Sequence, residues 1–381
     1  MSASAIIITI GDELPIGQVI DTNSAWMAQQ LNAIGIRVNR RIAIGDDREA
    51  IINALDEALK SAEVVLITGG LGPTSDDITK PVFTEYFGGP LIVNEAVLKH
   101  VTDFFKTRQR PMLDRNSKQA EVPKSCVVLP NLMGTAPGMW FEKEGRIIVS
   151  LPGVPYEMQH LMETGVLPRL KARYNTLRPM LHRNLLTAGE GESFVAEQIK
   201  DIEESLPENI RLAYLPSPGY LRLRLTAENN GTGKELEVEM DRLRDALAQR
   251  LASYVVAVED QTIQQVLAGL LEEKGVWLSL AESCTAGYIA HLLTQVPGTS
   301  KHLRGGLVCY HPDIKKELLH VPAELIEKEG IVSEAVAESM ARGVLETFKG
   351  DLGFGITGYL GWPRRRKSNY RHCMHGRCAG E

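Results

Sequence analysis

A glycine-rich loop followed by two aspartates is the stretch of this sequence with the clearest chemistry. The strand-like run VVLIT leads into Gly69, Gly70 and Gly72, and then into Asp76 and Asp77. Glycines directly after a buried strand let backbone N–H groups approach an anion, because no Cβ stands in the way. Hard cations such as Mg²⁺ take oxygen ligands and often bridge carboxylates to phosphate oxygens. The pattern predicts a site for a phosphate ester with its metal ion. The alternative is a plain strand–turn–helix junction in which Asp76 or Asp77 caps the helix.

A serine at a second strand-to-helix junction is the other candidate for chemistry. Ser283 follows the apolar run Val276–Leu280 and precedes a helical stretch. This geometry suits a nucleophile with helix-end amides nearby as an oxyanion site. Lys315 lies five residues beyond Tyr310, and a buried neutral lysine can serve as the base of a serine. The alternatives are a helix-capping serine and, at Cys284, either a second nucleophile or a small buried residue.

The elements around the glycine loop predict how it is positioned. Apolar strand-like runs alternate with amphipathic helical stretches at residues 5–10, 22–34, 36–44, 51–60 and 64–68. This β-α-β-α-β order predicts a doubly wound α/β sheet with right-handed crossovers. Ligands bind outside the carboxyl ends of the strands in such sheets. We therefore expect three loops, Gly11–Glu13, Gly45–Asp47 and Gly69–Asp77, to meet at one edge of the sheet.

Composition narrows the class of protein. A chain of 381 residues predicts two or three domains, and 44% apolar with 24% charged residues is typical of a globular protein. A net charge of −6 argues against a general nucleic-acid partner. The first residues have neither a basic segment nor an apolar run long enough for a signal peptide or membrane span. Five scattered cysteines form no disulfide or zinc pattern. These features predict a cytoplasmic protein without a membrane partner.

Composition and periodicity also suggest domain limits. We expect a nucleotide-binding α/β domain over residues 1–171, an α+β connector over 172–260 and a third α/β domain over 261–361. In the connector, residues 221–227 alternate with period two and predict a half-exposed strand. Arg222 and Arg224 on that strand could form a basic surface for RNA, although arginines on the wet face of a sheet usually only solvate it.

Residues 362–381 break the composition of the rest of the chain. This segment reads WPRRRKSNYRHCMHGRCAGE, with six Lys or Arg residues against one acid and two of the five cysteines. Three interpretations are open: a basic tail, a Cys/His metal-binding tract, or a chain that has left its reading frame. The abrupt change after Gly361 favours the third.

Five motifs in the first domain resemble one known family. They are GDELxxGxxxDTN at residues 11–23, GGLGPTxDDxTK at 69–80, NxxQA at 116–120, NxxGTAPG at 131–138 and LPGVPxEM at 151–158. Their order and spacing resemble the N-terminal domain of the competence/damage-inducible CinA family, which is similar to the molybdopterin-binding fold. The resemblance implies a metal-dependent pyrophosphatase that acts on ADP-ribose. Diphosphate hydrolysis needs charge neutralisation and an activated water, which suits a carboxylate-rich phosphate cradle. A non-catalytic pterin- or nucleotide-binding protein is the alternative, because the same fold binds molybdopterin.

The resemblance also assigns roles to residues. It implies a divalent metal ion, Mg²⁺ or a transition metal such as Co²⁺, with K⁺ as a further ion, and Asp46, Asp76 and Asp77 as metal ligands. Asp77 would also be catalytic, whereas Asp12 could equally be a turn residue. The implied substrate-binding residues are Asn23, Gly69, Gly70, Gly72, Asn116, Gln119, Gly134, Thr135 and Gly153. CinA-like chains carry a small connector domain and often dimerise, but nothing in the sequence fixes the oligomer.

The third domain resembles the C-terminal CinA domain, a nicotinamide mononucleotide deamidase. AESCTxG, GGxxxYxxxxK and the ITG loop carry this resemblance, and it implies Ser283 as nucleophile with Lys315 and Tyr310 assisting. Two departures matter: Ala286 stands where the family usually has glycine, and the basic segment replaces the family's glycine-rich loop, strands and helix after the ITG loop. We therefore expect an inactive deamidase in a poorly packed, incomplete domain.

Overall fold

The computed structural model describes residues 3–74, 76–175, 180–227, 233–359 and 373–379. The chain divides into two compact units. The first is Met1–His182 with Pro207–Arg211 and Thr226–Met240, and the second is Arg183–Leu206 with Leu212–Leu225 and Asp241–Glu381. Within the described ranges, no helix combines the length and the apolar character needed to cross a bilayer.

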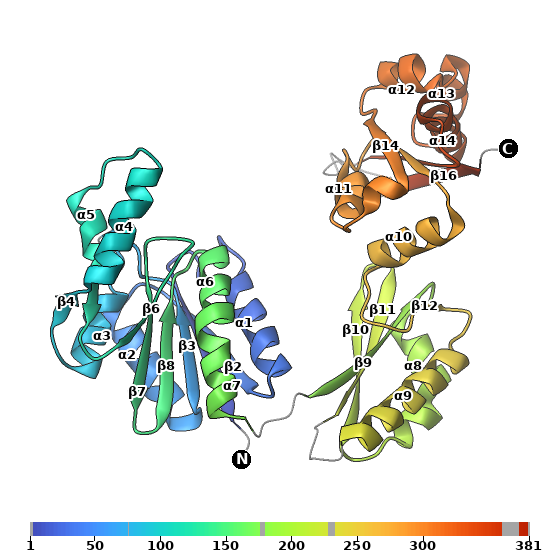
Figure 1. The fold of residues 1–381 in the computed structure, drawn as a ribbon. Helices are drawn as coiled ribbons and strands as arrows, with labels where there is room; N and C mark the ends of the chain where they lie inside the picture. The colour runs from blue at the N-terminus through green and yellow to red at the C-terminus, as the bar shows by residue number, and fades with distance from the viewer. Residues whose placement is uncertain (1–2, 75, 176–179, 228–232, 360–372, 380–381) are drawn as a thin grey trace. The chain divides into compact units, whose positions relative to one another are not determined.

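The first unit is built on a six-stranded mixed sheet with the order β2-β1-β3-β8-β7-β6 (Figure 1). Its strands are β1 (Ser4–Ile10), β2 (Arg37–Ile44), β3 (Val64–Thr68), β6 (Val127–Leu129), β7 (Gly138–Lys143) and β8 (Arg146–Leu151). Strands β2, β1, β3 and β8 are parallel neighbours, as the alternation of strands and helices predicts. Strands β7 and β6 run antiparallel, so a hairpin extends one side of the sheet.

Helices cover both faces of this sheet. They are α1 (Thr22–Ala33), α2 (Arg48–Ser61), α3 (Thr79–Phe87), α4 (Glu95–Thr107), α5 (Asp114–Ser117), α6 (Pro155–Leu161) and α7 (Leu167–Arg173), with a π-helical turn at Met162–Val166 and a 3₁₀ turn at Lys118–Ala120. A separate two-stranded ribbon joins β4 (Leu91–Val93) to β5 (Glu121–Pro123).

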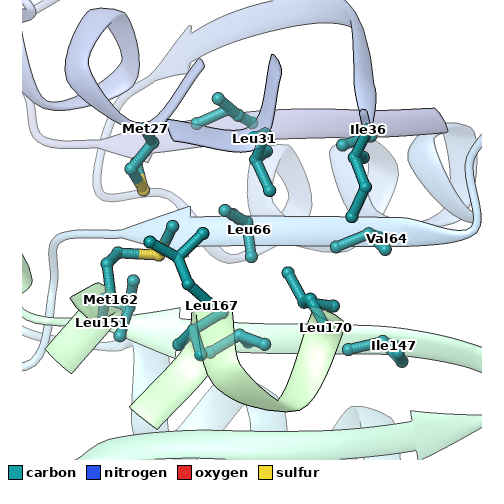
Figure 2. Close-up of a cluster of buried hydrophobic side chains, with 14 of the residues drawn as sticks. Met27, Leu31, Ile36, Val64, Leu66, Ile147, Leu151, Met162, Leu167 and Leu170 are labelled. Carbon is teal, nitrogen blue, oxygen red and sulfur yellow. The ribbon is translucent and has the colours of Figure 1, made fainter. Parts of the chain in front are cut away.

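Alternate residues of the central strands feed two separate hydrophobic clusters. In β1, Ala5 and Ile7 belong to the cluster on one face, and Ile6 and Ile8 belong to the cluster on the other. Figure 2 shows the first cluster, to which Met27, Leu31, Ile36, Val64, Leu66, Ile147, Leu151, Met162, Leu167 and Leu170 contribute. All five residues of β3 are buried, because helices pack on both sides of it. A continuous apolar run is therefore what this central strand requires.

The connector region carries a four-stranded sheet with the order β10-β11-β9-β12. Its elements are β9 (Leu181–Ala188), α8 (Glu192–Glu204), β10 (Ile210–Ser217), β11 (Tyr220–Ala227), α9 (Gly233–Arg250) and β12 (Val255–Ala257). In β11, Leu221, Leu223 and Leu225 are buried and alternate with partly exposed residues, as the period of two predicts. The partly exposed Arg222 lies within 2.7 Å of the Asp260 carboxylate.

The C-terminal region forms a second α/β sheet, with the order β14-β13-β15-β16. Its elements are α10 (Ile263–Lys274), β13 (Leu278–Glu282), α11 (Tyr288–Thr294), β14 (Leu303–Val308), α12 (Pro312–Leu319), α13 (Ala323–Glu329), α14 (Glu334–Phe348), β15 (Leu352–Gly358) and β16 (Cys373–Ala379). Strand β13 pairs in parallel with β14 and β15. Two hydrophobic clusters pack here, so the poor packing that we expected is not visible among the residues described.

The basic segment contributes to this sheet. Strand β16 lies within it and pairs antiparallel along the whole of β15, from Leu352 opposite Ala379 to Gly358 opposite Cys373. The rest of the segment, residues 362–372 and 380–381, lies outside the described residues, so the prediction of a lost reading frame stays a prediction.

Candidate functional sites

Three loops of the first unit meet at the carboxyl edge of its sheet, as expected. The backbone N–H of Asp12, after β1, donates to Oδ2 of Asp46 at 3.1 Å. The N–H of Asp46, after β2, donates in turn to Oδ1 of Asp12 at 3.0 Å. The glycine loop, Gly69–Asp77, completes the group, since a Cβ on Gly70 would lie 3.4 Å from Oδ1 of Asp46. We call this arrangement the sheet-edge site.

Burial and negative charge act together on Asp46. Burial raises the pKa of its carboxyl, and the nearby charges of Asp12, Glu13 and Asp77 raise it further, against the hydrogen bond from the Asp12 amide. Like charges close together disfavour ionisation of each. Several carboxylates therefore lie close to Asp46, and a bound cation would reduce the repulsion among them.

The glycine loop begins in a conformation that other residues do not adopt easily. Gly69 has φ +114° and Gly70 has φ +63°. A Cβ on Gly69 would overlap the carbonyl oxygen of Ile10, and one on Gly70 would overlap the hydroxyl of Thr79. The hydroxyl of Thr79 donates to the Gly69 carbonyl at 3.3 Å. Both glycines are required by this tight turn, which brings backbone rather than side chains to the sheet edge.

Asp77 holds the glycine loop closed. Its Oδ1 accepts from the Gly72 amide at 2.7 Å, and its Oδ2 accepts from the Thr74 amide at 2.9 Å and from the Thr74 hydroxyl. Asp76 is exposed, and a hydrogen bond from Thr74 lowers the pKa of its carboxyl. Of the three predicted metal ligands, Asp46 lies beside Gly70 and Asp77 holds the glycine loop, whereas Asp76 is exposed to solvent.

Lys80 anchors the end of the GGLGPTxDDxTK motif. Its buried Nζ donates to the Gln119 carbonyl at 2.9 Å and to the Lys118 carbonyl at 3.5 Å. Burial lowers its pKa to about 8, although the charges of Glu121 and Asp77 oppose the shift. Lys80 thus fixes the NxxQA motif against α3.

Of the residues in that motif, Gln119 and Asn116 are placed differently. Gln119 is 1% exposed, and no hydrogen bond to its side-chain oxygen is found within the described chain. Such a buried acceptor calls for a ligand or a water. Asn116 instead accepts from the Leu113 amide at 3.0 Å and holds the start of α5.

Asn23 connects α1 to the loop after β8. Its Nδ2 donates to the Gly153 carbonyl at 2.7 Å and to the Thr68 hydroxyl at 3.3 Å. Gly153 in turn lies against the glycine loop, because a Cβ placed on it would be 3.4 Å from Cα of Gly69. The Oδ1 of Asn23 is buried and has no hydrogen-bond partner in the part of the chain described. It is therefore a free acceptor beside the sheet-edge site.

The loop that joins β6 to β7 is organised by two residues that the sequence analysis did not single out, Asn131 and Glu157. Asn131 Nδ2 donates to Glu157 Oε2 at 2.6 Å and to the Ala136 carbonyl at 2.9 Å. Its Oδ1 accepts from the Gly134 amide at 3.1 Å. A Cβ on Gly134 would overlap the Glu157 carboxylate. Both residues lie in quoted motifs, and a glutamate in the first turn of a helix could have signalled a buried acceptor.

The metal-binding prediction meets a geometric limit. Within the described ranges, no group of three or more His, Cys, Asp or Glu side chains lies close enough to hold a metal ion. The carboxylates of Asp12, Asp46 and Asp77 are nevertheless the oxygen donors that hard cations prefer. One or two carboxylates together with substrate phosphates commonly suffice for Mg²⁺. The donor set therefore fits an ion that arrives with a phosphorylated ligand.

In the second unit, the predicted nucleophile and base are in contact. Lys315 Nζ lies 2.8 Å from Ser283 Oγ. The same Nζ donates to the Cys309 carbonyl at 2.6 Å and to the Tyr310 carbonyl at 3.3 Å. Lys315 is 1% exposed, and burial lowers the pKa of its amine. The three acceptors, Ser283 Oγ and the two carbonyl oxygens, match the three N–H donors of a lysine side chain.

The amides at the start of α11 bind a carboxylate of the protein, whereas we expected them to form an oxyanion site. Glu282 is 1% exposed, and its carboxylate accepts from the amides of Gly287, Ile289 and Ala290 at 2.9–3.1 Å. These amides at the start of α11 are therefore not available to an oxyanion. A carboxylate at this position is favoured by the helix dipole. Glu282 precedes Ser283 directly and holds the turn that presents it.

The other residues near Ser283 and Lys315 differ in their exposure and backbone conformation. Tyr310 is 68% exposed, and it contacts Lys315 through its backbone carbonyl. Cys284 is buried next to Ser283. Ala286 has φ +50°, a left-handed conformation that favours glycine. Ala286 therefore places a methyl group on a strained backbone.

Fold and sites together define a modular protein in which a molybdopterin-binding-type α/β domain precedes a small connector and a serine–lysine α/β domain. Three family models match in that order: the probable molybdopterin binding domain at residues 6–172, the damage-inducible protein CinA KH domain at 182–257 and the CinA C-terminal domain at 260–369. The chain belongs to the CinA family.

Relatives match along nearly the whole chain. A CinA-like protein of Flavobacterium psychrophilum is 45% identical over 373 residues, which cover 96% of this chain and 87% of that protein. A putative competence-damage inducible protein of Caldicellulosiruptor bescii is 40% identical over 360 residues, with 94% and 86% covered. A crystal structure of the protein CinA, of unknown function, from Thermoplasma acidophilum is 34% identical, covers 42% of this chain and 95% of that one, and has a TM-score of 0.39.

Proposed function

We propose that the N-terminal domain hydrolyses a nucleotide diphosphate such as ADP-ribose with the help of a divalent metal ion. The observation that carries this proposal is the exchange of hydrogen bonds between Asp12 and Asp46 beside Gly70. It puts the Asp46 carboxylate next to the turn at Gly70. A diphosphate with its cation has the complementary chemistry.

Each part of the sheet-edge site has a role in this proposal. Asp46 and Asp77 would hold the metal ion, which when bound neutralises phosphate charge and activates a water. The turn would bind a phosphate oxygen through the backbone amide of Gly70, because the Gly69 amide donates to the Leu151 carbonyl at 3.1 Å and the Gly72 amide donates to Asp77 at 2.7 Å. The free Oδ1 of Asn23 would accept from a ribose hydroxyl.

The alternative is a protein that binds a nucleotide or pterin without turnover. The two are separated by incubating the full chain with ADP-ribose and Mg²⁺ or Co²⁺, and following phosphorus NMR signals. A hydrolase converts the diphosphate signals into those of AMP and ribose 5-phosphate, and a chelator stops the conversion. Unchanged diphosphate signals at saturating protein would support the binding protein and contradict the hydrolase.

For the C-terminal domain we propose an assembled but inactive deamidase site. The 2.8 Å contact between Ser283 and Lys315 supports the presence of nucleophile and base. Against turnover stand the use of the α11 amides by Glu282 and the basic sequence WPRRRKS after Gly361, where the resemblance implies a glycine-rich loop. A serine nucleophile without an oxyanion site loses most of its transition-state stabilisation.

A further inference from the structure

A pocket of about 400 Å³ opens between α4 and the loop that joins β6 to β7. Its walls are mostly apolar and come from Val97, Val128, Pro130, Leu132 and Pro137. This volume is within the range of small-molecule sites, roughly 300–1,000 Å³. The loop at residues 130–137 is one of the motifs that the sheet-edge site does not use.

The polar groups of the pocket are few, and none of its described lining residues carries a permanent charge. The Nε2 of His100 donates to the Gly134 carbonyl at 3.0 Å, because a carbonyl oxygen can only accept. The Oδ1 of Asn94 accepts from the Val97 amide at 3.1 Å, which leaves its NH₂ as a donor. With the Thr135 hydroxyl, the pocket offers donors and acceptors but no counter-charge. It therefore suits an uncharged ring better than a phosphate.

The pocket is preformed. Both ends of the Asn131 amide are occupied within the loop and by Glu157, so the loop cannot open without breaking these bonds. The close fit of Gly134 over the Glu157 carboxylate leaves no room for a side chain there. A rigid wall binds a flat ligand without the entropy cost of ordering a loop.

The pocket is also linked to the glycine loop. Gly153 lies against Gly69, and Glu157 lies in the first turn of α6, which begins at Pro155, two residues after Gly153. Glu157 bonds directly to Asn131 in the pocket wall. The short segment from Gly153 to Glu157 therefore connects the glycine loop to the pocket wall.

We propose that this pocket binds the nucleobase of the ligand whose diphosphate lies on the glycine loop. The inference rests on the proposed function for the diphosphate end, but the base end can be tested alone. Apolar walls and Pro side chains would stack on the faces of the ring. Asn94, His100 and Thr135 would meet its polar edge.

Ala96 allows the pocket to be filled without disturbing the core. It lines the pocket, is exposed and lies in the first turn of α4, so Ala96→Trp should fold and block the space. Ala33→Trp is the matched control. Ala33 is also exposed and helical, but it lies at the end of α1 that leads into β2, away from the carboxyl edge of the sheet. Thermal unfolding should be alike for the two variants.

Calorimetric titration of the full chain with adenosine, inorganic pyrophosphate and ADP-ribose is the test. We expect Ala96→Trp to lower the affinity for adenosine and ADP-ribose by about 10-fold or more, as loss of base stacking would. The affinity for pyrophosphate should not change. Ala33→Trp should change none of the three. Equal affinities of wild type and Ala96→Trp for adenosine and ADP-ribose would overturn the pocket assignment. If Ala96→Trp abolishes adenosine binding but the wild-type chain does not hydrolyse ADP-ribose, the pocket assignment stands and the hydrolase assignment is rejected.

Discussion

Asp12 and Asp46 each donate a backbone N–H to the carboxylate of the other, at 3.1 and 3.0 Å. This reciprocal pair ties the loop after β1 to the loop after β2, and the Asp46 carboxylate lies beside Gly70 of the glycine loop. Burial, and then the nearby charges of Asp12, Glu13 and Asp77, raise the pKa of Asp46. A carboxyl with a raised pKa beside other carboxylates is more typical of functional sites than of structural ones.

The tight turn at Gly69 gives the first prediction. Gly69→Ala places a Cβ on a backbone with positive φ, where it would overlap the Ile10 carbonyl oxygen. This substitution should destabilise the N-terminal domain by at least about 2 kcal/mol. Gly153→Ala is the control, since its Cβ would meet Cα of Gly69 at 3.4 Å, an ordinary contact. Calorimetric unfolding of the full chain measures both. Equal transition temperatures for the two variants would contradict the geometry of the turn.

The buried amine of Lys80 gives a pH dependence. Its pKa is about 8 in the folded protein, below the ordinary value of 10.5. Below pH 8 the folded and unfolded states both bind the proton, so the folded state carries the full free-energy cost of burying the charged amine. Between pH 8 and 10.5 only the unfolded state keeps the proton, so stability rises with pH, by up to about 1.4 kcal/mol per unit.

Replacement of this lysine tests the assignment. Lys80→Met should remove that rise from the unfolding free energy of the N-terminal domain, measured between pH 7 and 10. Lys99→Met, at an exposed lysine paired with Asp103, should retain it. The same slope in both variants would show that Lys80 does not titrate in this window.

The strained alanine of the second site should respond to glycine. Ala286 has φ +50°, so Ala286→Gly should stabilise the C-terminal domain by about 0.5–1 kcal/mol, after the entropy that glycine adds to the unfolded chain. Ala290→Gly, within α11, should instead destabilise by about 1 kcal/mol. Hydrogen exchange of the amides in β13 and α11 reports both effects, and slower exchange in Ala290→Gly than in Ala286→Gly would contradict the prediction.

We expect the purified chain to form no nicotinic acid mononucleotide from nicotinamide mononucleotide, because the α11 amides are held by Glu282. Chromatography of the reaction mixture is the measurement. Product formation that Ser283→Ala abolishes would overturn this expectation.

Much of the first domain could be predicted from sequence. The buried apolar run of β3 and the alternation of strands and helices are enough to predict a parallel α/β sheet, because such sheets require both. The order of the strands then brings the three loops to one edge. The antiparallel hairpin of β7 and β6 was not predicted, since short apolar runs do not reveal the direction in which they pair.

The partners of individual carboxylates were harder to predict. Asp12 meets Asp46 because the parallel register pairs Ile10 with Ile44, and this register cannot be read from either strand alone. Asp76 was favoured over Asp12 by its place in the glycine loop, but the turn directs it to solvent. Similarly, Ser283 and Lys315 were paired correctly by residue type, whereas the role of Glu282 depends on the path of α11.

The most direct test of the hydrolase assignment is ADP-ribose hydrolysis by Asp46→Asn, with Asp103→Asn as a control that removes the same charge from the exposed face of α4. Because Asn can still accept the Asp12 amide, Asp46→Asn should fold and be at least as stable as wild type without metal. We predict that it loses metal-stimulated release of AMP by about 100-fold or more, while Asp103→Asn keeps wild-type rates. Equal hydrolysis by Asp46→Asn and wild type would contradict the assignment of the sheet-edge site.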